Sequence, residues 1–278
     1  MLRTRLWMGA VLIALTVGML FLDGRFTPLY PFLLVFFVAL AVLGTLELLA
    51  LLAPAFHPPR WVCLAGVVAV ALANWPAHVF EGLRGHDPLS HVLAVFAAVV
   101  LAAFLAEMAT FREPGGSVVR VALTVWVVAY LALLPSFLAQ VRWLKDGAPA
   151  LALCIFVPKS CDIGAYFTGR ALGRHRMTPV LSPKKTWEGL AGGLATAMLV
   201  AFGINRFFPV LSGDVSALGF GLVVGGAGVL GDLAESLIKR DCQRKDASAV
   251  VPGFGGVLDV IDAILFAAPV AYWWIRCG

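Results

Sequence analysis

The sequence predicts an all-α, polytopic integral membrane protein with about nine transmembrane helices. Hydrophobic residues make up 61% of the 278 residues and charged residues only 13%, which is about half the charged share of a soluble domain. The mean hydropathy is +0.92. A water-soluble chain of this size has too much surface to hide so much apolar material. The apolar residues come in long continuous runs, which exclude a β-barrel, a disordered chain and an ordinary cytosolic enzyme.

Each predicted helix is an apolar run close to the roughly 20 residues that cross a bilayer. The nine runs are residues 6–22, 32–54, 61–80, 91–110, 121–141, 148–168, 187–208, 215–231 and 257–276. The sixth run is unusual, because its uninterrupted apolar part, from Pro149 to Pro158, is too short to span. It has to continue through Lys159 and Asp162, whose charges then face a cavity or the protein interior.

The distribution of basic residues predicts the orientation in the membrane. With a cytoplasmic N-terminus, 14 of the 21 Lys and Arg residues fall on the cytoplasmic side and 6 on the far side, in agreement with the positive-inside rule. The start of the chain resembles a signal peptide but lacks a small-residue cleavage site, so we assign it to the first helix. Two polar segments, 169–186 and 232–256, are then cytoplasmic loops. We divide the chain into N-terminal transmembrane helices, residues 1–145, and a C-terminal catalytic membrane region, residues 146–278.

The first polar segment combines positive charges with hydroxyl groups. From Lys159 to Lys185 there are six basic residues and one acid, Asp162. Thr186 could cap the helix that follows, and Glu188 lies in its first turn, where a carboxylate is favoured. This pattern fits a cradle for phosphate groups. A positive-inside loop with snorkelling anchors explains the charge equally well.

The second polar segment contains carboxylates at helical spacing. Asp232, Glu235, Ser236 and Lys239 share one helical face, and a glycine-rich turn over residues 252–256 follows them. Asp259 and Asp262 then enter an apolar helix, where an idle carboxylate is costly. Converging carboxylates beside phosphate-binding bases suggest a divalent cation, Mg²⁺, that bridges to phosphates. The alternative is that the acids only pair with the nearby bases Lys239, Arg240, Arg244 and Lys245.

These segments resemble the phosphatidate cytidylyltransferase family, also called CDP-diacylglycerol synthases. The family's C-terminal signature is similar to Ser-x-x-Lys-Arg, four residues, Lys-Asp, five residues, Pro-Gly-His-Gly-Gly, two residues and Asp-Arg-x-Asp. The residues that match at this spacing are Ser236, Lys239, Arg240, Lys245, Asp246, Pro252, Gly253, Gly255, Gly256, Asp259 and Asp262. The blocks Asp162 to Arg170, Ser182 to Gly189 and Gly231 to Ser236 match as well.

The resemblance is specific over roughly residues 155–265 and rests on hydropathy alone before them. Two positions depart from the signature, since Phe254 replaces its His and Val260 replaces its Arg.

The resemblance implies transfer of CMP from CTP to phosphatidate, which yields CDP-diacylglycerol and pyrophosphate in phospholipid biosynthesis. It implies catalytic roles for Asp232, Lys239, Arg240, Lys245, Asp246, Asp259 and Asp262, with Asp232 and Asp259 as metal ligands. It implies substrate-binding roles for Lys159, Asp162, Arg170, Ser182, Lys184, Lys185, Thr186, Glu188, Ser236, Gly253, Gly255 and Gly256.

The resemblance also sets expectations for cofactor, partners and location. Mg²⁺ is the expected cofactor, and a monovalent cation such as K⁺ beside it is left open. We expect a homodimer in the cytoplasmic (inner) membrane, surrounded by membrane lipids, with the active site facing the cytoplasm and no nucleic-acid partner.

Three other interpretations stay open at this stage. Phe254 and Val260 are consistent with a paralogue that acts on another nucleotide or lipid phosphate, or with a catalytically impaired family member. Another lipid-head-group or polyprenyl-phosphate enzyme would show similar metal and phosphate chemistry. A transporter is less consistent, because polar residues gather in one half of the chain and at one face.

A few isolated residues give smaller predictions. Glu47 and Glu107 lie in predicted spans and could be interior hydrogen-bonding residues, and Pro135 should kink the fifth helix. The five cysteines form no CxxC pair, so we expect neither a disulfide framework nor a zinc site.

Overall fold

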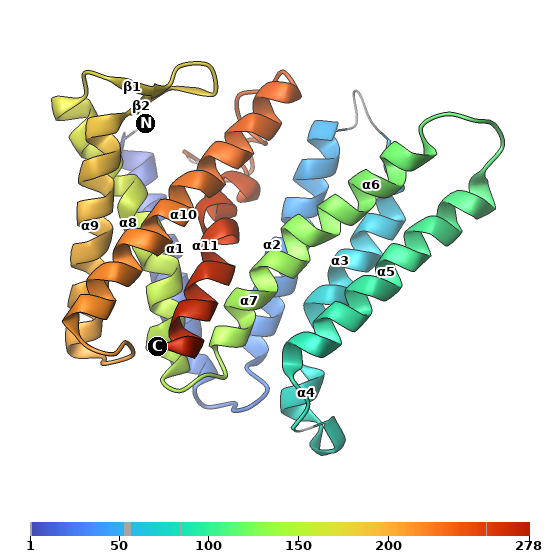
Figure 1. Cartoon of the computed structure of the whole chain (residues 1–278), viewed down its shortest axis with the longest axis horizontal. Helices are drawn as coiled ribbons and strands as arrows, with labels where there is room; N and C mark the ends of the chain where they lie inside the picture. Colours follow the sequence, from blue (N-terminus) through green and yellow to red (C-terminus); the bar gives the residue numbers. More distant parts are fainter. Residues whose placement is uncertain (1, 53–56, 84, 254) are drawn as a thin grey trace. The chain divides into compact units, whose positions relative to one another are not determined.

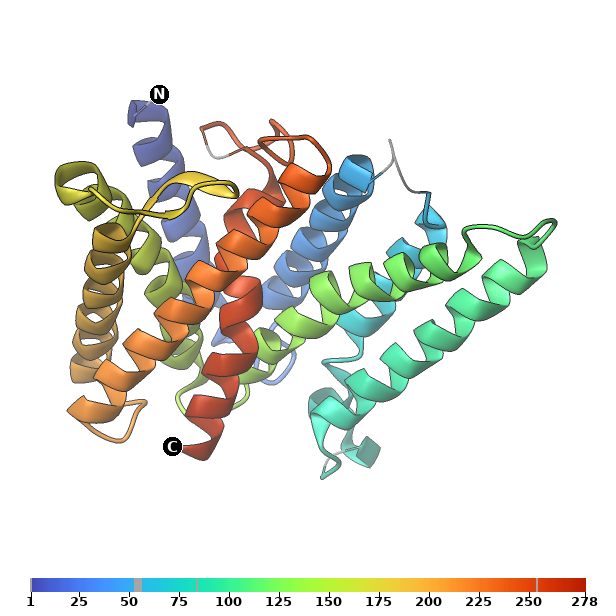
Figure 2. The ribbon, with the colours of Figure 1, turned by 45° about the horizontal axis from the view of Figure 1, so that its top comes forward.

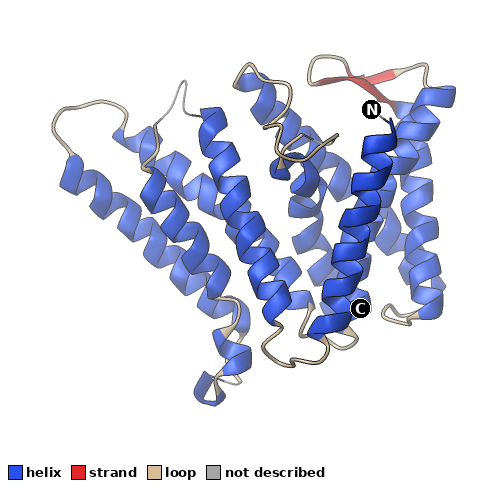
Figure 3. Ribbon diagram, turned by 180° about the vertical axis from the view of Figure 1, so that it is seen from behind, coloured by secondary structure: helices blue, strands red, loops and turns tan. Residues whose placement is uncertain are grey.

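The computed structural model describes residues 2–52, 57–83, 85–253 and 255–278, with side chains from Trp7 onward, and most of them are helical (Figures 1 and 3). The elements are α1 (Leu2–Asp23), α2 (Pro31–Leu52), α3 (Arg60–Leu72), α4 (Pro76–Val79), η1 (Glu81–Leu83), α5 (Pro88–Thr110), α6 (Ser117–Val128), η2 (Ala129–Leu133), α7 (Leu134–Val141), α8 (Gly147–Leu172), β1 (Arg176–Thr178), β2 (Ser182–Thr186), α9 (Trp187–Phe207), α10 (Asp214–Asp241) and α11 (Val257–Cys277). The all-α, polytopic class is confirmed.

Eight segments of the described chain are long and apolar enough to cross a membrane, and each coincides with a predicted run. They are Pro31–Leu52, Arg60–Val79, Pro88–Thr110, Ser117–Val141, Gly147–Leu172, Trp187–Phe207, Asp214–Asp241 and Val257–Cys277. The first predicted run, 6–22, falls on α1, whose described part Trp7–Asp23 is a shorter apolar helix. The count of nine therefore stays a prediction.

The chain folds into two compact units. The first unit comprises Met1–Gln140 and Asp246–Leu258, and the second comprises Val141–Lys245 and Asp259–Gly278. The loop before α11 thus belongs to the first unit, although it comes late in the chain. The division into a membrane part and a catalytic part at residue 145 concerns function and stays a prediction.

In the first unit, two of the membrane-spanning segments are interrupted. The segment Arg60–Val79 breaks between α3 and α4, where the Asn74 side chain donates to the carbonyl of Val70 and to Ser136 Oγ at 3.1 and 2.9 Å. The segment Ser117–Val141 contains the π-helical turn η2, two residues before Pro135. Since proline lacks an N–H and crowds the carbonyl four residues earlier, a π-turn at this place accommodates it. The fifth helix is therefore irregular where the sequence predicted a kink.

In the second unit, α8, α9 and α10 pack closely because glycines line their contacts. A Cβ atom on Gly193 of α9 would lie 2.7 Å from the Cys161 carbonyl of α8, and one on Gly221 of α10 would lie 2.5 Å from Met198 Cα of α9. Small residues let membrane helices approach to backbone contact. The long helix α8 continues through Lys159 and Asp162, as the sequence predicted.

Both predicted cytoplasmic loops contain regular structure that the sequence pattern missed. Residues 169–172 end α8, and β1 and β2 form an antiparallel hairpin in which Arg176 pairs with Thr186 and Thr178 with Ser182. Helix α10 continues to Asp241, ten residues past its predicted end at 231, so the second loop begins only at Cys242. Figure 2 shows the hairpin across the ends of α8 and α9, at the same end of the second unit as the last turns of α10.

We expect Gly193→Leu to destabilise the second unit by about 2 kcal/mol, because the new side chain overpacks the α8–α9 contact. Gly203→Leu is the matched control, since Gly203 lies in the same helix and has open space around its Cβ position. Thermal unfolding in detergent compares the two variants. Equal melting temperatures would contradict the close α8–α9 packing.

Candidate functional site: a charged cluster in the second unit

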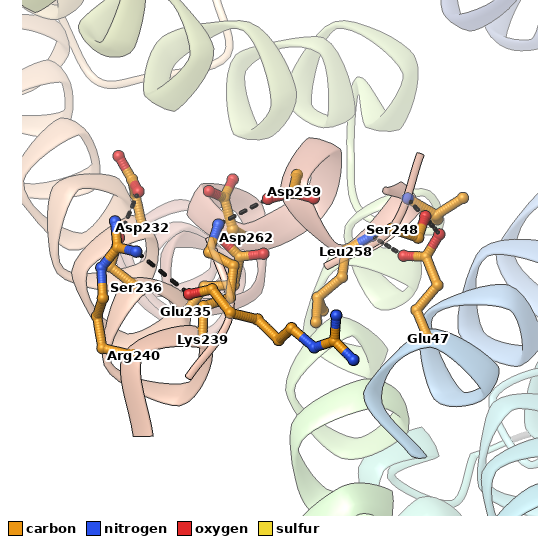
Figure 4. Close-up of polar contacts among 12 residues, drawn as sticks. Glu47, Asp232, Glu235, Ser236, Lys239, Arg240, Ser248, Leu258, Asp259 and Asp262 are labelled. Atoms are coloured by element: carbon orange, nitrogen blue, oxygen red, sulfur yellow. Dashed lines mark hydrogen bonds and ion pairs between the residues drawn. The ribbon is translucent and has the colours of Figure 1, made fainter. Parts of the chain in front are cut away.

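A cluster of eight charged side chains lies where the polar ends of α8, β2, α10 and α11 meet. Figure 4 shows its members from α10 and α11. We call it the charged cluster; its members are Lys159, Asp162, Lys185, Asp232, Glu235, Lys239, Asp259 and Asp262. All belong to the second unit. The sequence analysis singled out seven of them as site residues and did not include Glu235.

Lys239 is the central cation of the cluster. Its Nζ lies 2.5 Å from Glu235 Oε2, one helical turn earlier in α10, and 2.6 Å from Asp259 Oδ1 in the first turn of α11. The three side chains are only 11%, 1% and 9% exposed, respectively. Because a charge in a poorly solvated place needs a partner of opposite sign, this lysine joins α10 to α11.

Lys159 makes the equivalent connection between α8 and α11. Its Nζ lies 2.9 Å from Asp262 Oδ1 and 3.7 Å from Asp162 Oδ2, three residues later in α8. Asp262 Oδ1 also accepts a hydrogen bond from the backbone N–H of Ala263 at 2.6 Å. The charges within α8 thus face protein partners, as the short apolar run of that helix predicted.

Lys185 brings the first polar segment of the sequence to the second. It lies in β2, and its Nζ is 2.7 Å from Asp232 Oδ2 of α10. Ser236 Oγ, on the next turn of α10, donates to Asp232 Oδ1 at 3.5 Å. Two segments that are far apart in the chain therefore build one site.

The geometry of the cluster fits a divalent cation. Asp232, Glu235 and Asp262 each offer a carboxylate oxygen, and these oxygens lie within 4.8 Å of one another. Glu235 Oε1 is buried and has no hydrogen-bond partner within the described chain. When all eight members are ionised, five carboxylates face three ammonium groups, which leaves two negative charges in excess. Hard oxygen ligands of this kind suit Mg²⁺.

One of the two carboxylates assigned to metal, Asp232, belongs to the group of three, whereas Asp259 contacts Lys239. A metal-binding role for Asp259 stays a prediction. The sequence analysis placed Glu235 on the same helical face as Asp232 but assigned it no role in the site. In the structure its carboxylate oxygen lies with those of Asp232 and Asp262.

Several predicted site residues hold the β1–β2 hairpin in place. Thr186 Oγ1 accepts from the Gly189 N–H at 3.1 Å and caps α9, as the sequence predicted. The Glu188 carboxylate accepts from the backbone N–H groups of Arg174 and His175 at 3.1 and 3.2 Å. Arg240 Nε donates to the Leu181 carbonyl at 3.3 Å.

Other predicted residues are exposed or lie in the loop before α11. Lys184 is exposed on β2, Arg170 is exposed and donates to Tyr166 Oη at 3.2 Å, and Lys245 and Asp246 are exposed after α10. Ser182 is half-buried at the start of β2. In the loop of the first unit, Gly253 and Gly255 have φ values of 84° and 112°, which favour glycine. Phe254 lies outside the described residues, and Val260 is half-buried in α11.

Among the four bases named for the alternative, Lys239 is the one whose ion pairs with these acids the described part of the chain shows. Arg240 donates instead to the backbone carbonyls of Leu181 and Arg244. The other partners of the acids, Lys159 and Lys185, come from elsewhere in the chain. The carboxylates therefore converge through the tertiary structure.

Both isolated carboxylates of the first unit are interior hydrogen-bonding residues, as expected. Glu47 accepts from Ser248 Oγ and from the backbone N–H groups of Val257 and Leu258. Glu107 pairs with Arg120, whose Nη2 lies 2.8 Å from Glu107 Oε2.

A polytopic α-helical membrane protein with a carboxylate and lysine cluster at the polar ends of its helices is suited to chemistry on phosphate groups at a membrane. The chain belongs to the cytidylyltransferase family, whose model matches residues 3–277. Membership makes it a nucleotidyltransferase of lipid biosynthesis and confirms the resemblance seen in the sequence.

Three relatives illustrate this similarity. The uncharacterised protein YnbB of Escherichia coli (strain K12) is 31% identical over 285 residues, which cover 99% of this chain and 87% of that protein. The phosphatidate cytidylyltransferase of Haemophilus influenzae is 46% identical over 114 residues, 40% of each chain. The phosphatidate cytidylyltransferase of Mycobacterium bovis is 29% identical over 273 residues, which cover 95% of this chain and 86% of that enzyme.

We expect Lys239→Met to destabilise the protein by about 3 kcal/mol, because it leaves the buried Glu235 and Asp259 carboxylates without their cation. Lys184→Met removes a lysine that is exposed and should change the melting temperature little. Thermal unfolding in detergent measures both. A Lys239→Met protein as stable as the Lys184→Met protein would show that the pairing contributes nothing to the fold.

Proposed function

We propose that the protein is a phosphatidate cytidylyltransferase, which transfers CMP from CTP to phosphatidate and releases pyrophosphate. The observation that carries the proposal is the charged cluster, where three carboxylates suited to a cation lie among lysines suited to phosphates. Family membership and the names of the relatives support the same activity.

In the proposed reaction, a phosphate oxygen of phosphatidate attacks the α-phosphorus of CTP in line with the leaving pyrophosphate. The new P–O bond forms as the bond between the α-phosphorus and the bridging oxygen breaks, and the electron pair leaves with pyrophosphate. Such a transfer depends on positioning and on neutralisation of phosphate charge more than on a covalent intermediate. Lysines supply this neutralisation, and we assign it to Lys159, Lys185 and Lys239.

We propose that Asp232, Glu235 and Asp262 hold Mg²⁺, since their oxygens lie within 4.8 Å of one another. When bound, the ion would neutralise charge on the phosphate oxygens. Asp259 contacts Lys239 at 2.6 Å, and we assign it to orienting that lysine.

We assign substrate binding to the surroundings of the cluster. Ser182, Lys184 and Arg170 would contact phosphate groups, whereas Thr186 and Glu188 would keep the hairpin in place. The positive-φ glycines Gly253 and Gly255, in the turn of the first unit, would let the backbone approach a substrate closely. Lipid would enter from the bilayer and nucleotide from the cytoplasm. A homodimer in the inner membrane completes the proposal.

We expect purified protein in detergent micelles to convert labelled CTP and dioleoyl phosphatidate to CDP-diacylglycerol only with Mg²⁺, and EDTA to stop the reaction. Asp232→Asn and Asp259→Ala should each lower turnover at least about 100-fold, because each removes a group that places or neutralises a phosphate. Asp214→Asn is the matched control, since Asp214 is exposed in the first turn of the same α10. A fully active Asp232→Asn enzyme would overturn the metal assignment.

A second candidate is a paralogue that acts on another nucleotide or lipid phosphate. The replacement of the signature His and Arg by Phe254 and Val260 favours it. The same assay with other nucleotides and lipid phosphates separates the two candidates. A folded protein that is inactive with CTP and phosphatidate, yet active with another pair, would replace the first proposal.

We expect the hairpin to face the cytoplasm, because the basic residues around it follow the positive-inside rule. Cys242 and Cys277 are first changed to serine, because they are the cysteines that are not buried. Two exposed positions are then changed to cysteine one at a time: Val180, in the hairpin, and Ser212, between α9 and α10. A membrane-impermeant maleimide should label Ser212→Cys in spheroplasts and Val180→Cys only in inside-out vesicles. The reverse pattern would invert the proposed topology.

A further inference from the structure

A buried carboxylate of α2 contacts both ends of the loop before α11, and the proposed function makes no use of it. Glu47 is 8% exposed and accepts three hydrogen bonds. The donors are Ser248 Oγ at 2.7 Å, the Val257 N–H at 2.9 Å and the Leu258 N–H at 2.8 Å. Figure 4 shows Glu47 between Ser248 and Leu258. All of these residues belong to the first unit.

Glu47 contacts both ends of the segment from Ser248 to Leu258, of which the structure describes all residues but Phe254. Within it, Val251 and Gly255 exchange two backbone hydrogen bonds of 2.7 and 3.0 Å, which tighten the glycine-rich turn. Gly256 faces the carboxylate so closely that a Cβ atom there would collide with it. The close approach of the Glu47 carboxylate therefore explains why the last residue of the turn is glycine.

Glu47 also supplies the start of α11 with acceptors. The first N–H groups of a helix have no partner within the helix, and a negative charge beside them is favourable. The residue before Val257 is Gly256, which has no side chain to act as a cap. Glu47 performs this role from another helix, and the two hydrogen bonds fix where α11 begins.

We propose that Glu47 is a positioning residue for the reaction, which holds the glycine-rich turn and sets the start of α11. The inference rests on the proposed function, because its consequence is catalytic. Asp259 follows Leu258 directly, and Asp262 lies one turn later in the same helix. If the first turn of α11 unwinds, the orienting carboxylate and one proposed metal ligand lose their register. Glu47 itself touches neither substrate nor ion in this proposal.

The test compares Glu47→Met with Glu47→Gln in the assay above. Glu47→Met removes every acceptor, so we expect at least about a tenfold fall in kcat, the equivalent of one charge-assisted hydrogen bond. More Mg²⁺ should be needed for half-maximal thermal stabilisation, because Asp262 loses its register. Glu47→Gln keeps an acceptor oxygen and should recover part of the lost kcat. If Glu47→Met fails to fold, the comparison of Glu47→Gln with the wild type provides the test.

Glu107→Gln is the matched control, because Glu107 is another buried carboxylate in a membrane-spanning segment of the first unit, and it contacts Arg120 instead. It should leave kcat and the Mg²⁺ requirement unchanged.

Hydrogen–deuterium exchange gives a readout that does not depend on activity. Amides in residues 251–258 should exchange at least about tenfold faster in Glu47→Met and Glu47→Gln than in the wild type and the control. Unchanged exchange in that loop, or unchanged kcat and Mg²⁺ requirement in both variants, would overturn the inference. If the wild type makes no CDP-diacylglycerol, the proposed function fails, and exchange together with Mg²⁺ stabilisation still decides the role of Glu47.

Discussion

The second unit depends on the pairing of charges that its helices carry into poorly solvated places. An unpaired carboxylate or ammonium group there would cost several kcal/mol. Each charged helix end therefore lies beside a helix that carries the opposite charge. Lys239 joins α10 to α11, and Lys159 joins α8 to α11. The positions of the helix ends are thus set by electrostatics as much as by the glycine contacts deeper in the unit.

The same requirement explains why the hairpin belongs to the site. Lys185 reaches Asp232 from β2, while Glu188 and Arg240 hold the hairpin backbone. When all eight members are ionised, the carboxylates of the cluster outnumber its lysines by two. The pairs that join the helices and the residues proposed to bind cation and phosphate are therefore drawn from one set of side chains. Substitutions in this set will affect stability and activity together, so both need to be measured.

In the loop before α11, contacts with Glu47 explain part of the glycine-rich turn over residues 252–256. Its glycines look like a flexible turn in the sequence, but they serve two different requirements. Gly253 and Gly255 adopt positive φ values, whereas Gly256 makes room for Glu47. The turn is consequently a defined structure held by a buried carboxylate.

The sequence by itself determined the membrane class, the path of α8 through Lys159 and Asp162, the Thr186 cap and the family, because hydropathy, helical spacing and motifs are local properties of the chain. The sequence did not predict the β1–β2 hairpin or the extension of α10 to Asp241. Polar residues near a membrane surface have the composition of a loop even where they form a helix or a strand. Only the tertiary structure decided which charges meet. It brought Asp262 to Asp232 and Glu235, paired Asp259 with Lys239, and brought Glu47 to the first residues of α11. Such pairings depend on how distant helices pack, and no local pattern carries that information.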